Sequence, residues 1–356
     1  MSYLARSHER WAALLRIVSR RASAGAFVSI VAIGLGSASA SAADPPQGNP
    51  APARAETPAP PLRPDKSEAE PLPTPAASLP APPPADTSLP PLVWRDDWPR
   101  FRFWEYVATG AAAAASFATL AIPPPSSKWR NLNAFDEKAR LALRFPDQDD
   151  RDVARDTSDL LMSLMINQLF LDTLVVTWWW RGQGSIAWEM NLINIEAMAL
   201  NGAFHGLTSV FAGRERPYHG VCTGPEADQH RDCRGSKRYR SFFSGHTSTS
   251  FVAAGLMCSH HIAMPLYGGG DAEAWLMCVG GFASAATVGL MRVMSDQHYM
   301  SDVVSGATVG TLFGLGVPWI LHYRSRATPD RAAGGPPAVS VQFVPTLGGG
   351  YVTGQF

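Results

Sequence analysis

The chain has 356 residues, of which 46% are hydrophobic and only 17% are charged. It is therefore long enough to bury a substantial core, and it is poor in charge for a water-soluble protein. Lys and Arg total 30 and balance 30 Asp and Glu, and this zero net charge argues against nucleic acid as a general partner. No feature of the composition identifies a protein partner.

The N-terminal segment, residues 1–43, has the pattern of a secretory signal peptide. Five arginines precede an apolar stretch at 24–36, and small residues at 38–43 offer cleavage sites. An uncleaved anchor is the alternative. Residues 44–93 are rich in Pro and Ala and almost free of large apolar side chains, which predicts a disordered, extended linker.

The folded part is expected over residues 94–325, after an aromatic cluster that begins at Trp94. A polar segment, 123–157, contains the pattern of one short amphipathic helix near 141–145. Longer apolar runs predict six helices, at 106–122, 159–180, 185–212, 249–264, 274–291 and 303–321. The core has no strand signal, so we expect an all-α, six-helix bundle.

The tail, residues 326–356, changes character. Residues 339–345 alternate between apolar and polar side chains, and the Gly-rich stretch 348–356 can pair back on them. This pattern predicts a short β-hairpin of unassigned role.

Between the last two apolar runs lies a cluster of chemically capable side chains. His298 and Asp302 are four residues apart at the start of a predicted helix, which places both on one face. A carboxylate there can accept a hydrogen bond from one imidazole nitrogen and leave the other nitrogen free to attack. Arg292, at the end of the preceding run, could bind an anion beside that nitrogen. Taken alone, such a His-Asp pair is more often a structural hydrogen bond.

Two further anion-friendly clusters lie upstream, each at the end of an apolar run. Arg214 and Arg216 come before Pro217, which we expect to end the helix 185–212. Ser244-Gly245-His246 opens the run 249–264. Glycine lets the backbone approach a ligand there, and the free N–H groups of a helix N-terminus bind anions. Three such clusters in one chain predict a site for a small anionic group.

Together these clusters resemble the tripartite motif of the type 2 phosphatidic acid phosphatase and vanadium haloperoxidase superfamily. That motif reads Lys, six residues, Arg-Pro; then Pro-Ser-Gly-His; then Ser-Arg, five residues, His, three residues, Asp. The matching residues, in order and with the same internal spacing, are Arg216-Pro217, Ser244-Gly245-His246, Arg292, His298 and Asp302. The resemblance covers roughly residues 94–323 and implies a helical bundle of the acid phosphatase and haloperoxidase type.

The resemblance also implies a mechanism, in which a phosphomonoester or pyrophosphate is hydrolysed through a phosphohistidine on His298. Asp302 would orient His298, and His246 would protonate the leaving oxygen. The phosphoryl oxygens would be held by Arg216, Ser244, Gly245 and Arg292. Such catalysis depends on preorganised donors around the developing charge.

Three positions depart from the motif, and one of them affects the chemistry. Ser209 stands where the family has Lys, whereas Phe243 replaces Pro and Met291 replaces Ser at supporting positions. Losing one cationic donor costs on the order of 2.7–4 kcal/mol of transition-state stabilisation. Neighbouring cations that could replace the lysine are Arg214, Lys237, Arg238 and Arg240.

The four cysteines suit an exported protein. Cys222 and Cys233 flank a loop between the first two motifs, and a disulfide between them would rigidify it in an oxidising compartment. Metal binding is the alternative, but the Cys and His spacings match no common zinc site, so no metal is predicted. Cys258 and Cys278, inside apolar runs, are expected to be buried thiols.

Three functions from different classes stay open. The first is a phosphatase for a lipid phosphate or pyrophosphate, which needs no cofactor. The second is a vanadium-dependent haloperoxidase, with vanadate as its cofactor. The third is a non-catalytic lipid-binding relative, motivated by Ser209. If run 106–122 does not span, five crossings place the motif loops on the periplasmic side of a bacterial inner membrane. A soluble periplasmic protein, similar to the class A acid phosphatases, is the alternative.

Overall fold

The structure is a computed structural model that describes residues 89–125, 129, 133–224, 233 and 236–324, and the backbone of 340–346 and 349–355. The predicted signal peptide, most of the predicted linker and the start of the tail lie outside the described residues. Residues 82–356 form one compact unit, and the description below concerns that unit.

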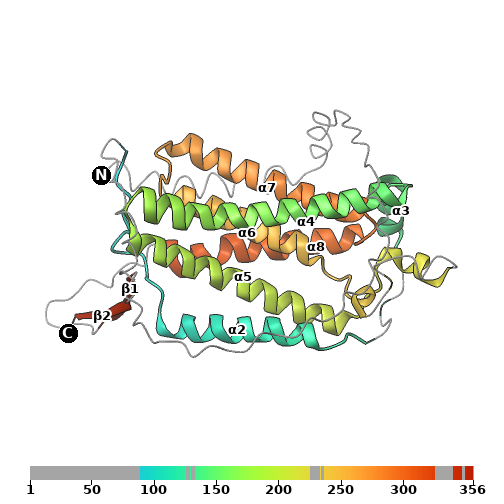
Figure 1. Ribbon diagram of the computed structural model, residues 1–356, viewed down its shortest axis with the longest axis horizontal. Coiled ribbons are helices and arrows are strands. Elements are labelled where there is room, and N and C mark those ends of the chain that lie inside the picture. Colours follow the sequence, from blue (N-terminus) through green and yellow to red (C-terminus); the bar gives the residue numbers. More distant parts are fainter. Residues whose placement is uncertain are drawn as a thin grey trace, which may run out of the picture. The chain divides into compact units, whose positions relative to one another are not determined.

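Six long helices lie side by side (Figure 1). They are α2 (Phe103–Ala121), α4 (Gln148–Phe170), α5 (Gly184–Ala212), α6 (Gly245–Ala263), α7 (Gly270–Met294) and α8 (Met300–Thr311). π-Helical stretches extend α4 through η1 (Leu171–Trp180), and α8 through η5 (Leu312–Gly316) and η6 (Pro318–Tyr323). The predicted all-α bundle is confirmed.

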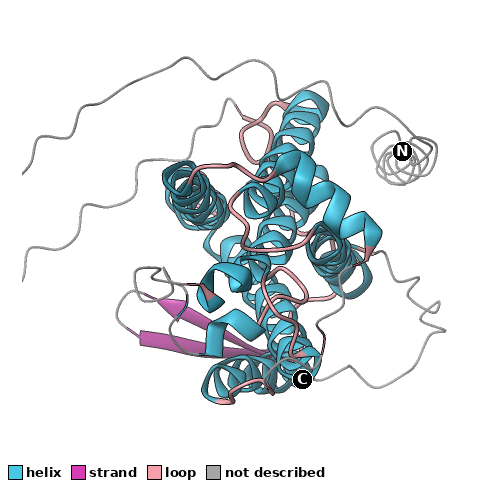
Figure 2. Cartoon of the chain, turned by 90° about the vertical axis from the view of Figure 1, so that its right-hand side faces the viewer, coloured by secondary structure: helices cyan, strands magenta, loops and turns pink. Residues whose placement is uncertain are grey.

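Shorter elements gather at one end of this bundle. They are α3 (Ala134–Leu143) and the 3₁₀ turns η2 (Pro217–Thr223) and η4 (Ser236–Tyr239). Figure 2 looks onto this end, where loops connect the helices. The short amphipathic helix was predicted slightly too late, because α3 ends at Leu143 and Phe145 follows it.

Two other helix limits differ from the prediction for identifiable reasons. α4 begins at Gln148, well before the apolar run at 159, because its first turns are polar and carry Asp149 and Asp150 at the favourable end of the helix dipole. α5 ends at Ala212 because Gly213 adopts a left-handed conformation, with φ of 52°. The prediction that Pro217 ends α5 was wrong, because Pro217 is the first residue of η2.

The centre of the bundle is α6, which packs against α4, α5, α7 and α8 and has most of its residues buried. Close approach of α8 depends on three glycines spaced by four residues, Gly306, Gly310 and Gly314. A Cβ on any of them would collide with the backbone of α6 or of its N-cap residue, Ser244. Small residues at this spacing let two helices pack backbone to backbone.

The direction of the chain alternates from one long helix to the next, apart from the excursion through α3. α2 and α5 run in the same direction, since Ser116 lies against Gly202 and Thr119 lies against Gly206. Consequently the loop after α5 and the loop between α7 and α8 lie at the same end. This arrangement brings the three motifs together.

Three helical segments of the described chain are long and apolar enough to cross a membrane: Gln148–Trp180, Gly270–Met294 and Met300–Tyr323. α2 is not among them, and neither are α5 and α6. At the end of η1, Trp178, Trp179 and Trp180 are exposed, as is typical of aromatic residues at a membrane interface.

The tail contains the predicted hairpin. β1 (Ser340–Thr346) pairs antiparallel with β2 (Gly349–Gln355), with Ser340 opposite Gln355.

Candidate active site

His298 lies in the turn between α7 and α8, one residue before the N-cap of α8. The turn needs a left-handed residue, and Asp296 supplies it with φ of 59°. Two arginines of the α3 region hold the Asp296 carboxylate, Arg140 through Nε at 2.6 Å and Arg144 through Nε at 2.9 Å. The position of His298 is therefore fixed by contacts distant in sequence.

The imidazole of His298 is 2% exposed and has two different environments at its nitrogens. Nδ1 lies 2.8 Å from the carbonyl oxygen of Ser241, so Nδ1 carries the proton and donates it. Nε2 then presents a lone pair, and it has no partner among the described residues. Burial and the nearby cations Arg216 and Arg292 hold the pKa of His298 well below its usual range, which keeps the ring neutral and nucleophilic.

Asp302 supports His298 indirectly. Its buried carboxylate lies 3.7 Å from Nδ1 of His298, so the expected direct hydrogen bond is replaced by the one to the Ser241 carbonyl. Asp302 accepts hydrogen bonds from Ser241 Oγ at 2.6 Å and from the backbone N–H of Tyr299 at 3.0 Å. Asp302 thus orients Ser241, and the carbonyl of Ser241 orients the imidazole of His298.

Arg214 is the cation that balances this buried carboxylate. Its guanidinium donates to Asp302 at 2.5 Å and to Asp136 at 2.6 Å. It lies between the rings of Trp129 and Tyr299, at 4.3 and 4.4 Å from their centroids. With 1% of its surface exposed, Arg214 is fully engaged in the protein interior and is not available to replace the missing lysine.

Arg216 and Arg292 are differently placed. Arg216 precedes η2 and donates through Nη1 to Gln297 at 2.7 Å. Arg292, in the last turn of α7, is buried. The Nε atoms of both are buried and have no hydrogen-bond partner in the described part of the chain, like Nε2 of His298. Buried donors without partners mark the place of a ligand, and two guanidiniums select an anion.

His246 stands in the first turn of α6, and burial together with the nearby Arg216 lowers its pKa to about 4. Its Nε2 lies 3.0 Å from Oδ1 of Asp159 on α4, and Asp159 also forms an ion pair with Arg292. Asp159 was missed by sequence reasoning. The available signal was an acidic residue at the start of an otherwise apolar run.

Ser244 and Gly245 form the N-terminus of α6. Ser244 is the N-cap, and its hydroxyl accepts hydrogen bonds from the backbone N–H of Thr247 at 3.4 Å and from its hydroxyl at 2.8 Å. The hydroxyl therefore caps the helix. At Gly245 a Cβ would lie 2.8 Å from the His205 ring, so only glycine fits against that imidazole.

Ser209, at the position of the family lysine, is buried near the end of α5, and its hydroxyl has no partner within the described residues. Among the cations considered as replacements, Arg240 is engaged elsewhere. It donates to the carbonyls of Thr119 and Ile122, at 2.7 and 2.5 Å, at the end of α2. The described arginines whose charge lowers the pKa of His298 are Arg216 and Arg292.

The structure contains two disulfides. Cys222 pairs with Cys233 beside the first motif, as expected. Cys258 also pairs with Cys278, joining α6 to α7, so the prediction of two buried thiols was wrong. Helical periodicity places both residues in the core but does not show that two neighbouring helices bring them together.

Comparison with known proteins gives four similarities. Residues 192–326 match the family model of the PAP2 superfamily. A Lipid A 1-phosphatase of Porphyromonas gingivalis is 36% identical over 80 residues, or 22% of this chain and 16% of that protein. A PA-phosphatase related-family protein of Dictyostelium discoideum is 32% identical over 135 residues, or 36% of this chain and 47% of that protein. A crystal structure of a transmembrane PAP2-type phosphatidylglycerolphosphate phosphatase from Bacillus subtilis aligns with a TM-score of 0.38 and 19% identity, covering 61% of this chain and 94% of that chain.

The chain spans less than half of the length of either curated relative. The family match, by contrast, includes all three motifs. Residues 192–326 of this chain are thus similar to the PAP2 superfamily.

Proposed function

We propose that this protein hydrolyses a lipid phosphate or pyrophosphate monoester through a phosphohistidine formed on His298. One observation carries the proposal: the Nε2 atom of His298 is buried and has no partner among the residues that the structure describes. The tautomer of His298 is fixed by the Ser241 carbonyl, and two guanidiniums lie nearby. An imidazole nitrogen in this setting is an activated nucleophile beside an anion-binding site.

The proposed reaction has two steps. In the first, Nε2 of His298 attacks phosphorus, the P–O bond to the lipid breaks, and His246 donates its proton to the leaving oxygen. In the second, water attacks the phosphohistidine, His246 takes a proton from that water, and the N–P bond breaks with its electron pair returning to Nε2. Arg216 and Arg292 stabilise the charge on the phosphoryl oxygens in both steps. The reaction so written needs no metal ion or cofactor.

Three features support a lipid as the substrate. Three helical segments are long and apolar enough to cross a membrane, and the two curated relatives are named as a Lipid A 1-phosphatase and a PA-phosphatase related-family protein. In addition, an apolar cavity of about 450 Å³ lies between α4 and α7, with Leu161 and Leu164 on one side and Leu276 and Met277 on the other. It is lined by apolar side chains from both helices, which suits an acyl chain.

We place the protein in a bacterial inner membrane with the site facing the periplasm, and the soluble periplasmic form is the alternative. The disulfides favour an oxidising compartment. Protease protection of the segment after Tyr323 in spheroplasts tests the orientation. Recovery of the protein in an osmotic-shock fluid would exclude the membrane form.

One observation favours a second candidate function, a non-catalytic lipid-binding relative. The lysine of the family motif is replaced by Ser209, and Arg214 and Arg240 are engaged in other contacts. This candidate predicts lipid binding that survives His298→Ala, with no phosphate release.

The experiment is a phosphate-release panel without added metal. It covers phosphatidic acid, phosphatidylglycerol phosphate, polyprenyl pyrophosphate, lipid A and a soluble chromogenic ester. The wild type, His298→Ala and His219→Ala are compared, because His219 lies beside the first motif but contacts Glu215 rather than the site. We expect vanadate-sensitive release that is lost only in His298→Ala, with an acid-labile phosphoprotein in the wild type. No release on any substrate would reject the enzyme, and peroxide-dependent halogenation of a dye would indicate a haloperoxidase.

A further inference from the structure

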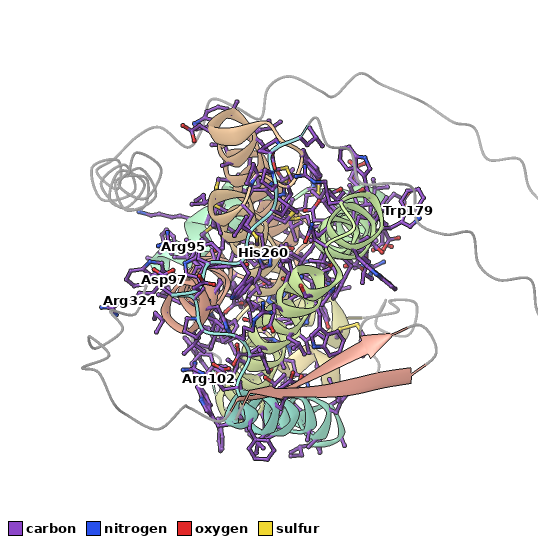
Figure 3. The ribbon with its side chains drawn as sticks, turned by 90° about the vertical axis from the view of Figure 1, so that its left-hand side faces the viewer. Arg95, Asp97, Arg102, Trp179, His260 and Arg324 are labelled. Carbon is purple, nitrogen blue, oxygen red and sulfur yellow. A yellow bond between two sulfur atoms is a disulfide. The ribbon has the colours of Figure 1, made fainter. Side chains whose placement is uncertain are left out.

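A second cluster of chemically capable side chains lies at the end of the bundle opposite the three motifs. It is formed where α2 begins, within the first half of α5 and at the end of η6. Figure 3 looks onto this end of the molecule, where Arg102 and Arg324 are labelled. Nothing in the proposed phosphatase reaction uses these residues.

The cluster contains Glu105 of α2, Glu196 of α5 and His322 of η6, exposed by 0%, 1% and 0%. One donor atom from each residue lies within 4.8 Å of one from each of the others. His322 Nε2 and Glu196 Oε2 are already 3.0 Å apart. Around a zinc ion with bonds of 2.0–2.1 Å, tetrahedral donors lie about 3.3 Å apart, so only the third donor has to move closer.

The cluster is incompletely satisfied by the protein itself. Nδ1 of His322 is buried and has no hydrogen-bond partner among the described residues. The ring of Phe101 stacks on the imidazole, with centroids 5.7 Å apart and an interplanar angle of 4°. His322 is also the one ion-pair partner of Glu196 within the described chain. Glu105 and Glu196 are both buried, and their ion-pair partners within the described chain are Arg102 for Glu105 and His322 for Glu196.

α2 buries few apolar side chains against the bundle. Its buried residues are Glu105, Thr109, Ala112 and Thr119, of which only one is apolar. Hydrophobic burial therefore contributes little to holding α2 on the bundle. A link through Glu105 would tie α2 to α5 and to the end of α8 at a single point.

From this juxtaposition we propose that Glu105, Glu196 and His322 bind a divalent transition-metal ion, with zinc as the expected occupant, which fixes α2 to the bundle. Two carboxylates and one imidazole are a donor set that zinc and manganese accept. Water completes the coordination, as is usual where three protein ligands are present.

Arg102 is the competitor of the metal ion in this arrangement. Its guanidinium donates to Oε1 of Glu105, through Nε at 3.0 Å and through Nη2. The Arg102 side chain is 28% exposed, so it can turn into solvent when an ion binds. Removing its charge by Arg102→Gln should therefore strengthen metal binding, whereas a merely structural cluster would lose stability.

The bundle offers a matched control. His261 is equally buried and contacts two carboxylates, Glu273 at 2.5 Å from Nδ1 and Asp172 at 3.4 Å from Nε2. Its two partners lie at opposite nitrogens of the ring, so they cannot converge on one ion. The variant His261→Gln should leave metal binding unchanged.

The test uses the full chain purified in detergent, stripped with EDTA and then incubated with zinc or manganese alone. After gel filtration, the bound metal is measured by mass spectrometry for the wild type and for Glu196→Gln, His322→Gln, Arg102→Gln and His261→Gln. We expect one ion per wild-type and His261→Gln chain. In Glu196→Gln and His322→Gln, the affinity for the metal ion should fall by more than about 100-fold. This is more than the loss seen when a residue that only supports a ligand is removed.

A second measurement protects the test against variants that do not fold. Zinc should raise the unfolding midpoint of the wild type, and EDTA should reverse the shift. The proposal would be overturned if the wild type bound less than one zinc or manganese ion per chain and its unfolding midpoint did not change. Equal loss of metal in His261→Gln would overturn it too. Phosphate release reports on the other end of the bundle, so its presence or absence does not decide this result.

Discussion

Arg214 and Arg216 are two residues apart, yet the structure assigns them different roles, and paired substitutions separate these roles. Arg214→Met removes the guanidinium that pairs with the fully buried carboxylates of Asp136 and Asp302, at 2.6 and 2.5 Å. Breaking one buried ion pair by removing a partner costs about 3–5 kcal/mol. For a domain of this size, that lowers the unfolding midpoint by roughly 6–20 °C.

Arg216→Met is the matched control. Its Nε has no partner among the described residues, and its Nη1 donates to the uncharged Gln297. We therefore expect the unfolding midpoint to change little while kcat falls about 10²–10³-fold, as when one donor to a developing oxyanion is removed. Arg214→Lys should lie between the wild type and Arg214→Met in stability, because an ammonium keeps the charge but lacks the planar fork of donors with which the guanidinium contacts both carboxylates.

The assays are thermal unfolding in detergent, followed by far-ultraviolet circular dichroism, and phosphate release at a temperature where both variants are folded. If Arg214→Met kept the wild-type midpoint and lost kcat as Arg216→Met does, Arg214 would contact the phosphoryl group. The assignment of the two roles would then be wrong.

Three further predictions concern the site. Ser209→Lys restores the cation of the family motif and should raise kcat/KM. The uncharged Ser209→Met, of similar length, should not raise it. Equal values of kcat/KM for the two variants would show that the missing charge does not limit catalysis. Asp159→Asn removes the carboxylate shared by His246 and Arg292 and should lower kcat at unchanged stability, measured by phosphate release and thermal unfolding. Because burial and Arg216 lower the pKa of His246 to about 4, the free enzyme loses its proton donor as pH rises above that value. A bound anionic phosphate raises the pKa again, so the basic limb of kcat should lie at higher pH than that of kcat/KM. The basic limb should be absent in His246→Gln, and an unchanged profile there would remove His246 from its role as the acid.

Much of the fold followed from local patterns in the sequence. Apolar runs identified each long helix of the described chain, and Gly-rich alternation identified the hairpin, because these elements depend on side-chain periodicity over a few turns. Helix limits were less accurate. The polar first turns of α4 lack an apolar signal, and Gly213, rather than Pro217, ends α5.

The motif residues were also found from sequence, because their spacing within each cluster is a local property. The partners of those residues were not. Ser241, which accepts the hydrogen bond from His298, is 57 residues away. The residues paired with Arg214 are 78 and 88 residues away. Separations of this size are set by how helices pack, and no periodicity encodes them.

The sequence by itself determined that this is a helical protein with two histidines and at least two arginines at helix ends, in an order that predicts phosphoryl chemistry. The tertiary structure alone decided which nitrogen of His298 is free and that Arg214 is enclosed between two carboxylates. It also decided that Cys258 meets Cys278 and that Glu105 meets Glu196 and His322. The physical reason is that helix formation is local, whereas buried charges acquire their partners only when distant helices pack against one another.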